Sequence, residues 1–228
     1  RSTLFPYTTL FRSPAGRYDV AHRMRGLVPL TIYGDVRHGD LEIDTARGVV
    51  YAVREDHRGP GAPVNCLVAI PLDGSAARDD APVRTLVEGT DFVTSPTLSP
   101  DGERLAWITW NLPDMPWDNA VLHVGDLLRD ATLGARAELD GGQGYSVSEP
   151  RWTQEGELVH ASNASGFWNL YRTEGFPPAG QSPRGLDRRP AHPPPAPGPG
   201  HLHLPGLAAG PALLRYSRRG APHRLLGP

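Results

Sequence analysis

A glycine that recurs every 54 residues is the feature that most constrains how this sequence can fold. Gly48, Gly102 and Gly156 each end a short polar turn and precede a run suited to a β-strand. The turn at 99–102 reads Ser-Pro-Asp-Gly, and Asp and Gly supply the tight or left-handed backbone that a hairpin requires. A fixed period of this length indicates a repeat fold in which neighbouring units bury one another.

Each repeat predicts a set of short antiparallel strands rather than helices, because no stretch shows an apolar stripe of period 3.6. The first copy has runs at 41–44, 49–54, 64–72 and 83–87. The second has a short strand before its turn and runs at 104–110, 120–127 and 135–139. The third has runs at 149–152, 157–162 and 167–173, after which proline-rich sequence stands in place of a last strand.

Four short strands per repeat are typical of a propeller blade. The predicted fold is therefore all-β: an incomplete β-propeller of about three four-stranded blades at 33–88, 89–142 and 143–176, with non-native or disordered ends. The alternative is a β-sandwich, which also has short strands and frequent turns. Its turns do not normally recur at one fixed offset, so the propeller is favoured.

The two ends of the sequence differ from its body. Residues 1–13 match the translation of a widely used sequencing adapter, and we exclude them from the fold. Residues 14–32 receive no assignment. Residues 177–228 consist almost entirely of Pro, Ala, Gly, Arg, His and Leu. They are interpreted either as GC-rich DNA read in a shifted frame, which we favour, or as a disordered linker.

Charge and cysteine content limit the binding partners and the cellular location that the sequence predicts. The body, 14–176, holds 14 Arg against 24 acids, a net charge of −10, which argues against binding to nucleic acid. No apolar run reaches the roughly 18 residues that a membrane helix needs, so no membrane partner is expected. Cys66 is the single cysteine and excludes an internal disulfide. It mildly favours a reducing, cytoplasmic location.

The second repeat also carries a family resemblance. SPTLSPDGERLAWITW at 95–110 is similar to the propeller repeat of prolyl oligopeptidase family serine peptidases. The sequence that follows, at 111–127, resembles a more specific signature of bacterial members that act as dipeptidyl or acylaminoacyl peptidases. Supporting pieces occur in the same order as in that family, at 51–57, 67–74, 89–96 and 166–172.

The resemblance implies a two-domain aminopeptidase in which a propeller gates the access of short peptides to an α/β-hydrolase domain. That domain supplies a Ser-His-Asp triad, with the Ser in a G-x-S-x-G motif, and needs no cofactor or metal. The motif is absent from this sequence. We therefore expect no catalytic residue and no activity in this chain, and its main partner would be the missing hydrolase domain. The alternative is a non-enzymatic propeller that binds a protein.

The most distinctive candidate site is the loop 113–119, PDMPWDN. Its functional interpretation is a blade-end loop that contacts the hydrolase domain or the incoming peptide. Its structural interpretation, which we favour, is that the tryptophan caps its own blade while the two aspartates form turns. A metal site is not expected, because no third ligand lies nearby. The candidate residues are Asp114, Met115, Trp117 and Asp118.

Two further groups are expected to be structural. The charged run 54–57 is interpreted as a solvated strand end, with a contact to the partner domain as the alternative. Four aromatic residues at strand spacing are interpreted as packing between blades rather than as a ligand site. They are Tyr145, Trp152, Trp168 and Tyr171.

Overall fold

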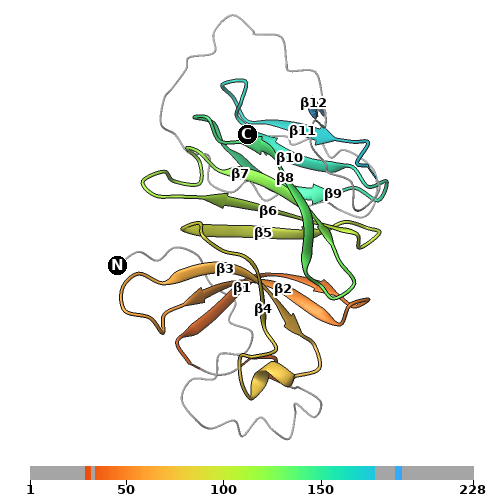
Figure 1. The fold of residues 1–228 in the computed structure, drawn as a ribbon. Coiled ribbons are helices and arrows are strands. Elements are labelled where there is room, and N and C mark those ends of the chain that lie inside the picture. Colours follow the sequence, from red (N-terminus) through yellow and green to blue (C-terminus); the bar gives the residue numbers. More distant parts are fainter. Residues whose placement is uncertain (1–28, 32–33, 178–187, 192–228) are drawn as a thin grey trace, which may run out of the picture. The chain divides into compact units, whose positions relative to one another are not determined.

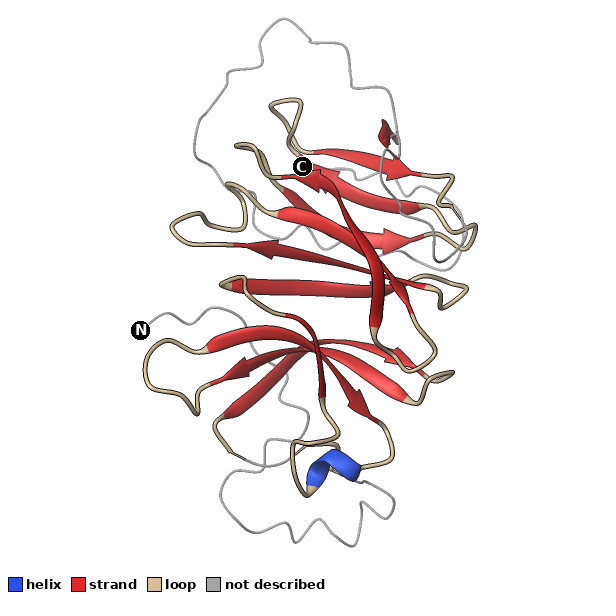
Figure 2. Cartoon of the chain, in the orientation of Figure 1, coloured by secondary structure: helices blue, strands red, loops and turns tan. Residues whose placement is uncertain are grey.

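The computed structural model describes residues 29–31, 34–177 and 188–191, which contain three four-stranded antiparallel sheets (Figures 1 and 2). In each sheet the strands pair in chain order. The first sheet contains β1 (Val36–Asp44), β2 (Val49–Asp56), β3 (Val64–Pro71) and β4 (Arg84–Val87). The second contains β5 (Phe92–Leu98), β6 (Arg104–Trp110), β7 (Val121–Leu127) and β8 (Leu133–Gly141). The third contains β9 (Val147–Trp152), β10 (Leu158–Ser162), β11 (Asn169–Thr173) and β12 (Arg188–Pro190).

This arrangement confirms the predicted all-β fold, a partial propeller of three four-stranded blades. The described residues contain no α-helix, and their one helical turn is the 3-10 segment η1 (Ser75–Ala77). No helix in this part of the chain is long and apolar enough to cross a membrane.

The third sheet differs from its prediction in one respect. Its fourth strand was expected to be missing, yet β12 pairs with β11 from within the proline-rich segment (Figure 1). The pairing is short and joins 171–173 to 188–190. Residues 1–13 and most of 177–228 lie outside the described residues, so the interpretations of both ends stay predictions.

The recurring glycines occupy equivalent places. Gly48, Gly102 and Gly156 all lie in the turn between the first and second strands of a sheet, with φ of 66°, 73° and 84°. This left-handed conformation is accessible to glycine at little cost, whereas a Cβ makes it unfavourable for most residues. The glycine turns at a constant interval therefore mark the same place in each blade, as predicted.

A second repeated feature was not predicted. The first strand of every sheet has a bulge at which a non-glycine residue adopts positive φ: Asp40 at 47°, Ser95 at 56° and Glu149 at 53°. A bulge of this kind bends the strand and increases its local twist. Polar residues with short side chains tolerate the left-handed region better than branched ones, so the pattern carries only a weak sequence signal.

The turns differ in length even though their glycines are evenly spaced. The residues between the last paired positions of the two strands are 45–48 in the first sheet, 99–104 in the second and 153–157 in the third. A shift of one residue moves a side chain to the opposite face of a strand. Residues that are 54 apart in the second strands of neighbouring sheets therefore point to opposite faces. Leu105 packs toward the first sheet, whereas Leu158, not Val159, packs toward the second.

Apolar side chains fill both spaces between neighbouring sheets. Tyr51 and Leu67 of the first sheet pack with Leu105 and Trp107 of the second. On the other side of the second sheet, its apolar residues pack with the third; this cluster contains Ala106, Ile108, Ala120, Leu122, Val147 and Leu158. Burial of these residues is the main favourable contribution to folding.

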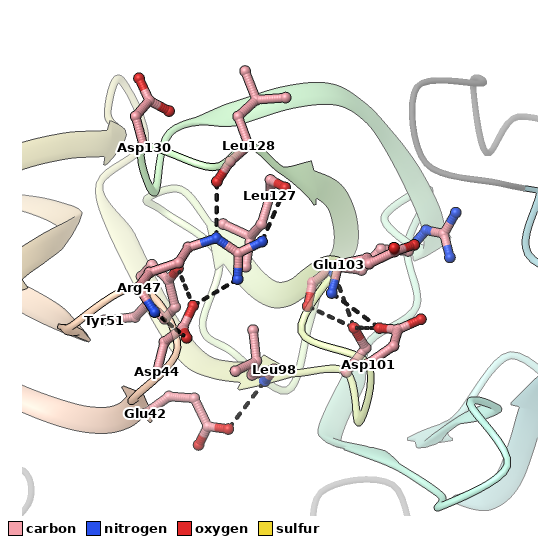
Figure 3. A network of polar contacts seen from close by, with 12 residues as sticks. Glu42, Asp44, Arg47, Tyr51, Leu98, Asp101, Glu103, Leu127, Leu128 and Asp130 are labelled. Atoms are coloured by element: carbon pink, nitrogen blue, oxygen red, sulfur yellow. Dashed lines mark hydrogen bonds and ion pairs between the residues drawn. The ribbon is translucent and has the colours of Figure 1, made fainter.

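An arginine fastens the first sheet to the second (Figure 3). Arg47 donates to the carbonyl oxygens of Leu128 at 2.8 Å and Leu127 at 3.2 Å. Asp44 orients the guanidinium at 2.8 Å and also accepts a hydrogen bond from the Tyr51 hydroxyl at 3.0 Å. Burial would raise the pKa of Asp44, but these hydrogen bonds outweigh it and hold that pKa below its usual value.

A related contact joins the second sheet to the third. Arg104 donates to the carbonyl oxygen of Pro177 and lies over the ring of Phe176, 5.4 Å from its centroid. The indole N–H of Trp152 donates to the carbonyl oxygen of Thr97 at 3.1 Å. In both interfaces an arginine therefore reaches from one sheet to the backbone at or just after the end of the third strand of the next.

Candidate functional site

The predicted loop joins β6 to β7 and is closed by its own aspartates. The Asp118 carboxylate accepts the backbone N–H of Met115 at 3.0 Å, and the Asp118 N–H donates to the Met115 carbonyl at 2.8 Å. Asp114 accepts a hydrogen bond from the side-chain amide of Asn119 at 2.9 Å. Both aspartates thus form local turns, as the structural interpretation expected.

Polar contacts also fix this loop to the connections between sheets. Asp91, in the β4–β5 connection, accepts the N–H of Leu112 at 2.8 Å, and its own N–H donates to the Asn111 side chain at 2.8 Å. Ser146, in the β8–β9 connection, donates to the carbonyl oxygen of Pro116 and accepts the N–H of Ala120 at 3.1 Å. A loop held at both ends presents its remaining side chains in a defined position.

Trp117 lies partly in solvent. Its side chain is 48% exposed, whereas Trp107 in the core is 1% exposed. Met115 beside it is half-buried. The loop therefore holds an indole ring in solvent on a hydrogen-bonded turn, which is what the functional interpretation requires of a contact residue.

A second aromatic loop lies beside the first. It joins β10 to β11 and contains Phe167, 59% exposed, and Trp168, 44% exposed. Its first residue, Asn163, exchanges two hydrogen bonds with Ser146, the residue that also holds the β6–β7 loop. Two successive blades thus place exposed aromatic side chains on connections that meet at one serine.

We call the exposed apolar side chains of these two loops the aromatic rim. It consists of Leu112, Trp117, Phe167 and Trp168. Both loops follow the second strand of their sheet, so they lie at the same end of the blades (Figure 1). The prediction assigned Trp168 to packing between blades, and it is exposed instead. The position of 163–168 in the repeat, equivalent to that of 111–120, was the signal that could have grouped the two loops.

The other predicted aromatics are less accessible. Trp152 packs in the interface between the second and third sheets and contacts Phe176, with ring centroids 5.1 Å apart. Tyr145 donates to Asp140 at 2.9 Å, and Tyr171 stacks on His160. Trp152 thus packs between blades, as expected, while Tyr145 and Tyr171 are partly buried against Asp140 and His160.

The charged run 54–57 forms a network at the end of β2. Arg54 bridges Asp56 at 3.0 Å and also contacts Asp80, which the long β3–β4 connection brings to it. Arg58 contacts the same two carboxylates, and its hydrogen bonds are the main reason that the pKa of Asp56 lies far below its usual range. These ion pairs lie within the first sheet and its β3–β4 connection, but Arg54 is buried, at 8% exposed, rather than solvated as predicted.

The first strands of the three sheets line a shallow groove of about 250 Å³. Two carboxylates in it are engaged: Asp40 accepts the N–H of Ser95 at 3.0 Å, and Glu42 accepts the N–H of Leu98 at 3.1 Å. Burial raises the pKa of Glu42. Within the described residues no group of three or more His, Cys, Asp or Glu side chains could hold a metal ion.

The sequence matches no protein-family model, and no curated protein matches it significantly. Solved structures do match. A puromycin-hydrolyzing peptidase from Mycobacterium tuberculosis is 32% identical over 72% of this chain, with a TM-score of 0.63. Puromycin hydrolase is 32% identical over 71% of the chain, with a TM-score of 0.62. A mutant of puromycin hydrolase complexed with PGG is 35% identical over 65%, with a TM-score of 0.59.

The chain belongs to the prolyl oligopeptidase family. It spans about a quarter of the length of these relatives: 25%, 24% and 23% respectively. Membership of this family confirms the resemblance found in the sequence. It also accounts for the blades, since the matched part of each relative has the same partial propeller fold.

Proposed function

We propose that this chain is part of the gating propeller of a bacterial serine aminopeptidase that hydrolyses short peptides. The observation that supports it most directly is the identity of 32% to a puromycin-hydrolyzing peptidase over 72% of the chain. The triad would lie in an α/β-hydrolase domain, because this sequence has no G-x-S-x-G motif. A cytoplasmic location is proposed on the weaker ground of the single cysteine.

The hydrolase domain is the proposed partner of the aromatic rim. Aromatic side chains that are exposed in one part of a protein and held by fixed loops are typical contact residues. Trp117, Phe167 and Trp168 fit this description, and their loops are tied to each other through Ser146. Asp114, Met115 and Asp118 would act by shaping the turn that presents Trp117.

A direct assay tests the catalytic part of the proposal. The purified 228-residue chain is incubated with puromycin and with aminoacyl chromogenic amides, beside a puromycin hydrolase as positive control. We expect no turnover by the chain. Cleavage that survives repurification would contradict the proposal. A stop codon after the last blade of the source gene would instead support the non-enzymatic binding module.

The docking part is tested in the intact gene product. Replacing Trp117 and Phe167 together by Ala should lower kcat/KM for peptides, because the propeller would no longer be held on the hydrolase domain. The matched control is Leu128→Ala: Leu128 is 48% exposed but lies in the β7–β8 connection, at the other end of the blade. Equal effects of both changes would exclude the rim as the contact surface.

A further inference from the structure

A cluster of three polar side chains lies between the second and third sheets, and two of them, Asp140 and His160, are buried. The His160 Nε2 atom lies 2.7 Å from the Asp140 carboxylate, and the two side chains are 0% and 1% exposed. The Tyr145 hydroxyl donates to the same carboxylate at 2.9 Å, and the Gly141 N–H donates at 2.8 Å. Asp140 lies next to the end of β8, the last strand of the second sheet, and His160 lies in β10, so the cluster crosses from one sheet to the next.

The corresponding place between the first and second sheets is apolar. Counting from the hairpin pairs Leu98–Leu105 and Trp152–Leu158, the position of His160 in β10 is that of Trp107 in β6. Trp107 packs there with Tyr51 and Leu67 in the largest hydrophobic cluster. One interface is therefore closed by an indole ring, and the other by a histidine, a residue type whose ordinary pKa is near 6.5.

The surroundings of His160 suit only its neutral form. Its Nε2–H serves Asp140, while Nδ1 has no hydrogen-bond partner among the described residues. A second proton would place an N–H and a positive charge at Nδ1 with no acceptor, and burial accordingly lowers the pKa of His160 to about 4. The Asp140 carboxylate also accepts hydrogen bonds from the Gly141 N–H and the Tyr145 hydroxyl, which reduces what a cationic ring could gain from it.

The neighbouring aromatic and charged side chains do not provide an acceptor for a proton on Nδ1 of His160. Tyr171 of β11 stacks on the His160 ring, with centroids 6.1 Å apart. In β9, Arg151 and Glu149 are exposed and pair with each other at 3.2 Å. In β6, Arg104 pairs with Asp126 of its own sheet at 3.3 Å.

We propose that the Asp140–Tyr145–His160 cluster is an acid-sensitive joint between blades. When His160 takes up a proton from solvent, the third sheet separates from the second, while the apolar interface around Trp107 stays closed. The joint is independent of the proposed peptidase role, because it requires only the two sheets.

Hydrogen exchange of the full chain at pH 7.5 and pH 5 tests this, with exchange times scaled for the intrinsic effect of pH. In the wild type, amides of 147–152, 158–162 and 169–173 should lose protection by about tenfold or more, the size expected when a buried histidine titrates. In His160→Gln the loss should fall below about threefold, because the amide can still donate to Asp140 but cannot take up a proton. His123→Gln is the control, since His123 bonds Thr109 within its own sheet at 2.8 Å.

Two results would overturn the joint. One is a pH-dependent loss that persists unchanged in His160→Gln. The other is an equal reduction of the loss in His123→Gln, which would show that the third sheet opens only by global unfolding. If His160→Gln does not fold, the wild type still decides. The NMR titration of the His160 ring in the folded chain should then have a midpoint well below that of an exposed histidine, and a midpoint near 6.5 would contradict the proposal.

Discussion

The guanidinium of Arg47 lies 2.8 Å from the carbonyl oxygen of Leu128, so a turn of the first sheet is fastened to the backbone of the second. The acceptor is a main-chain atom, which every residue type provides. Such a contact constrains the residue that donates but not the sequence of the blade that accepts. It therefore suits a repeat fold whose blades differ in sequence.

Removing this donor should loosen the first interface. Arg47→Ala would abolish the hydrogen bonds to Leu127, Leu128 and Asp44 and leave a largely buried carboxylate with fewer donors. We expect a loss of about 2 kcal/mol in the free energy of unfolding, measured by urea denaturation. The control is Arg37→Ala, whose side chain is 56% exposed and pairs with Glu55 at 3.5 Å. It should change stability by less than about 0.5 kcal/mol, and equal losses would show that Arg47 has no special role.

A glycine at the end of β8 is expected to be irreplaceable. Gly141 has φ of 92°, and a Cβ there would lie 2.0 Å from the carbonyl oxygen of Ala120. Gly141→Ala should cost about 3 kcal/mol or more and reduce the yield of folded protein, because backbone must move to relieve the clash. Gly166→Ala is the matched control: its φ is 86° but its Cβ would meet nothing within 4 Å. If both variants melt at the same temperature, strain at φ rather than the close approach explains the cost.

Stability should fall as the pH is lowered from 7.5 to 5.5, because buried histidines must take up protons. Burial, as the largest cause, lowers the pKa of His38 and of His123 from 6.5 to about 4. In the unfolded chain these rings take up protons near pH 6.5, so the unfolded state binds more protons between pH 6.5 and 4, and the folded state loses stability there as pH falls. From pH 7.5 to 5.5 we expect a loss of about 1 kcal/mol per histidine in urea denaturation. His123→Gln should reduce the loss, and a pH-independent midpoint would contradict the assignment of neutral buried rings.

Sequence patterns predicted local chemistry better than the fit between neighbouring elements. The glycine turns were predicted because a left-handed turn constrains one residue directly, as at Gly102. The faces of the second strands were not, because turns of different length move Val159 out of the position that an offset of 54 assigns to it. The exposure of Trp168 was missed because strand spacing does not show that it lies in the β10–β11 loop, whose first residue Asn163 contacts Ser146. The pairing of β12 with β11 was missed because its three residues carry no strand signal of their own.

The far face of the third sheet leads to the last prediction. Val159 and Ala161 of β10 are only partly buried there, and Leu170 of β11 is 37% exposed, with no further sheet on this face among the described residues. The far face of the first sheet differs, since Leu30 and the η1 residue Ala76 pack against its apolar side chains.

Because an uncovered apolar sheet face promotes association, the isolated chain should self-associate or unfold partly at micromolar concentration. Sedimentation velocity over a concentration series measures this. Leu170→Glu should shift the chain toward monomer, since a carboxylate in the middle of that face opposes its burial. Ile43→Glu, at a residue 60% exposed in β1, should not. A soluble wild-type monomer with one sharp, cooperative melt would show that three blades suffice for a stable unit and that the far face needs no cover.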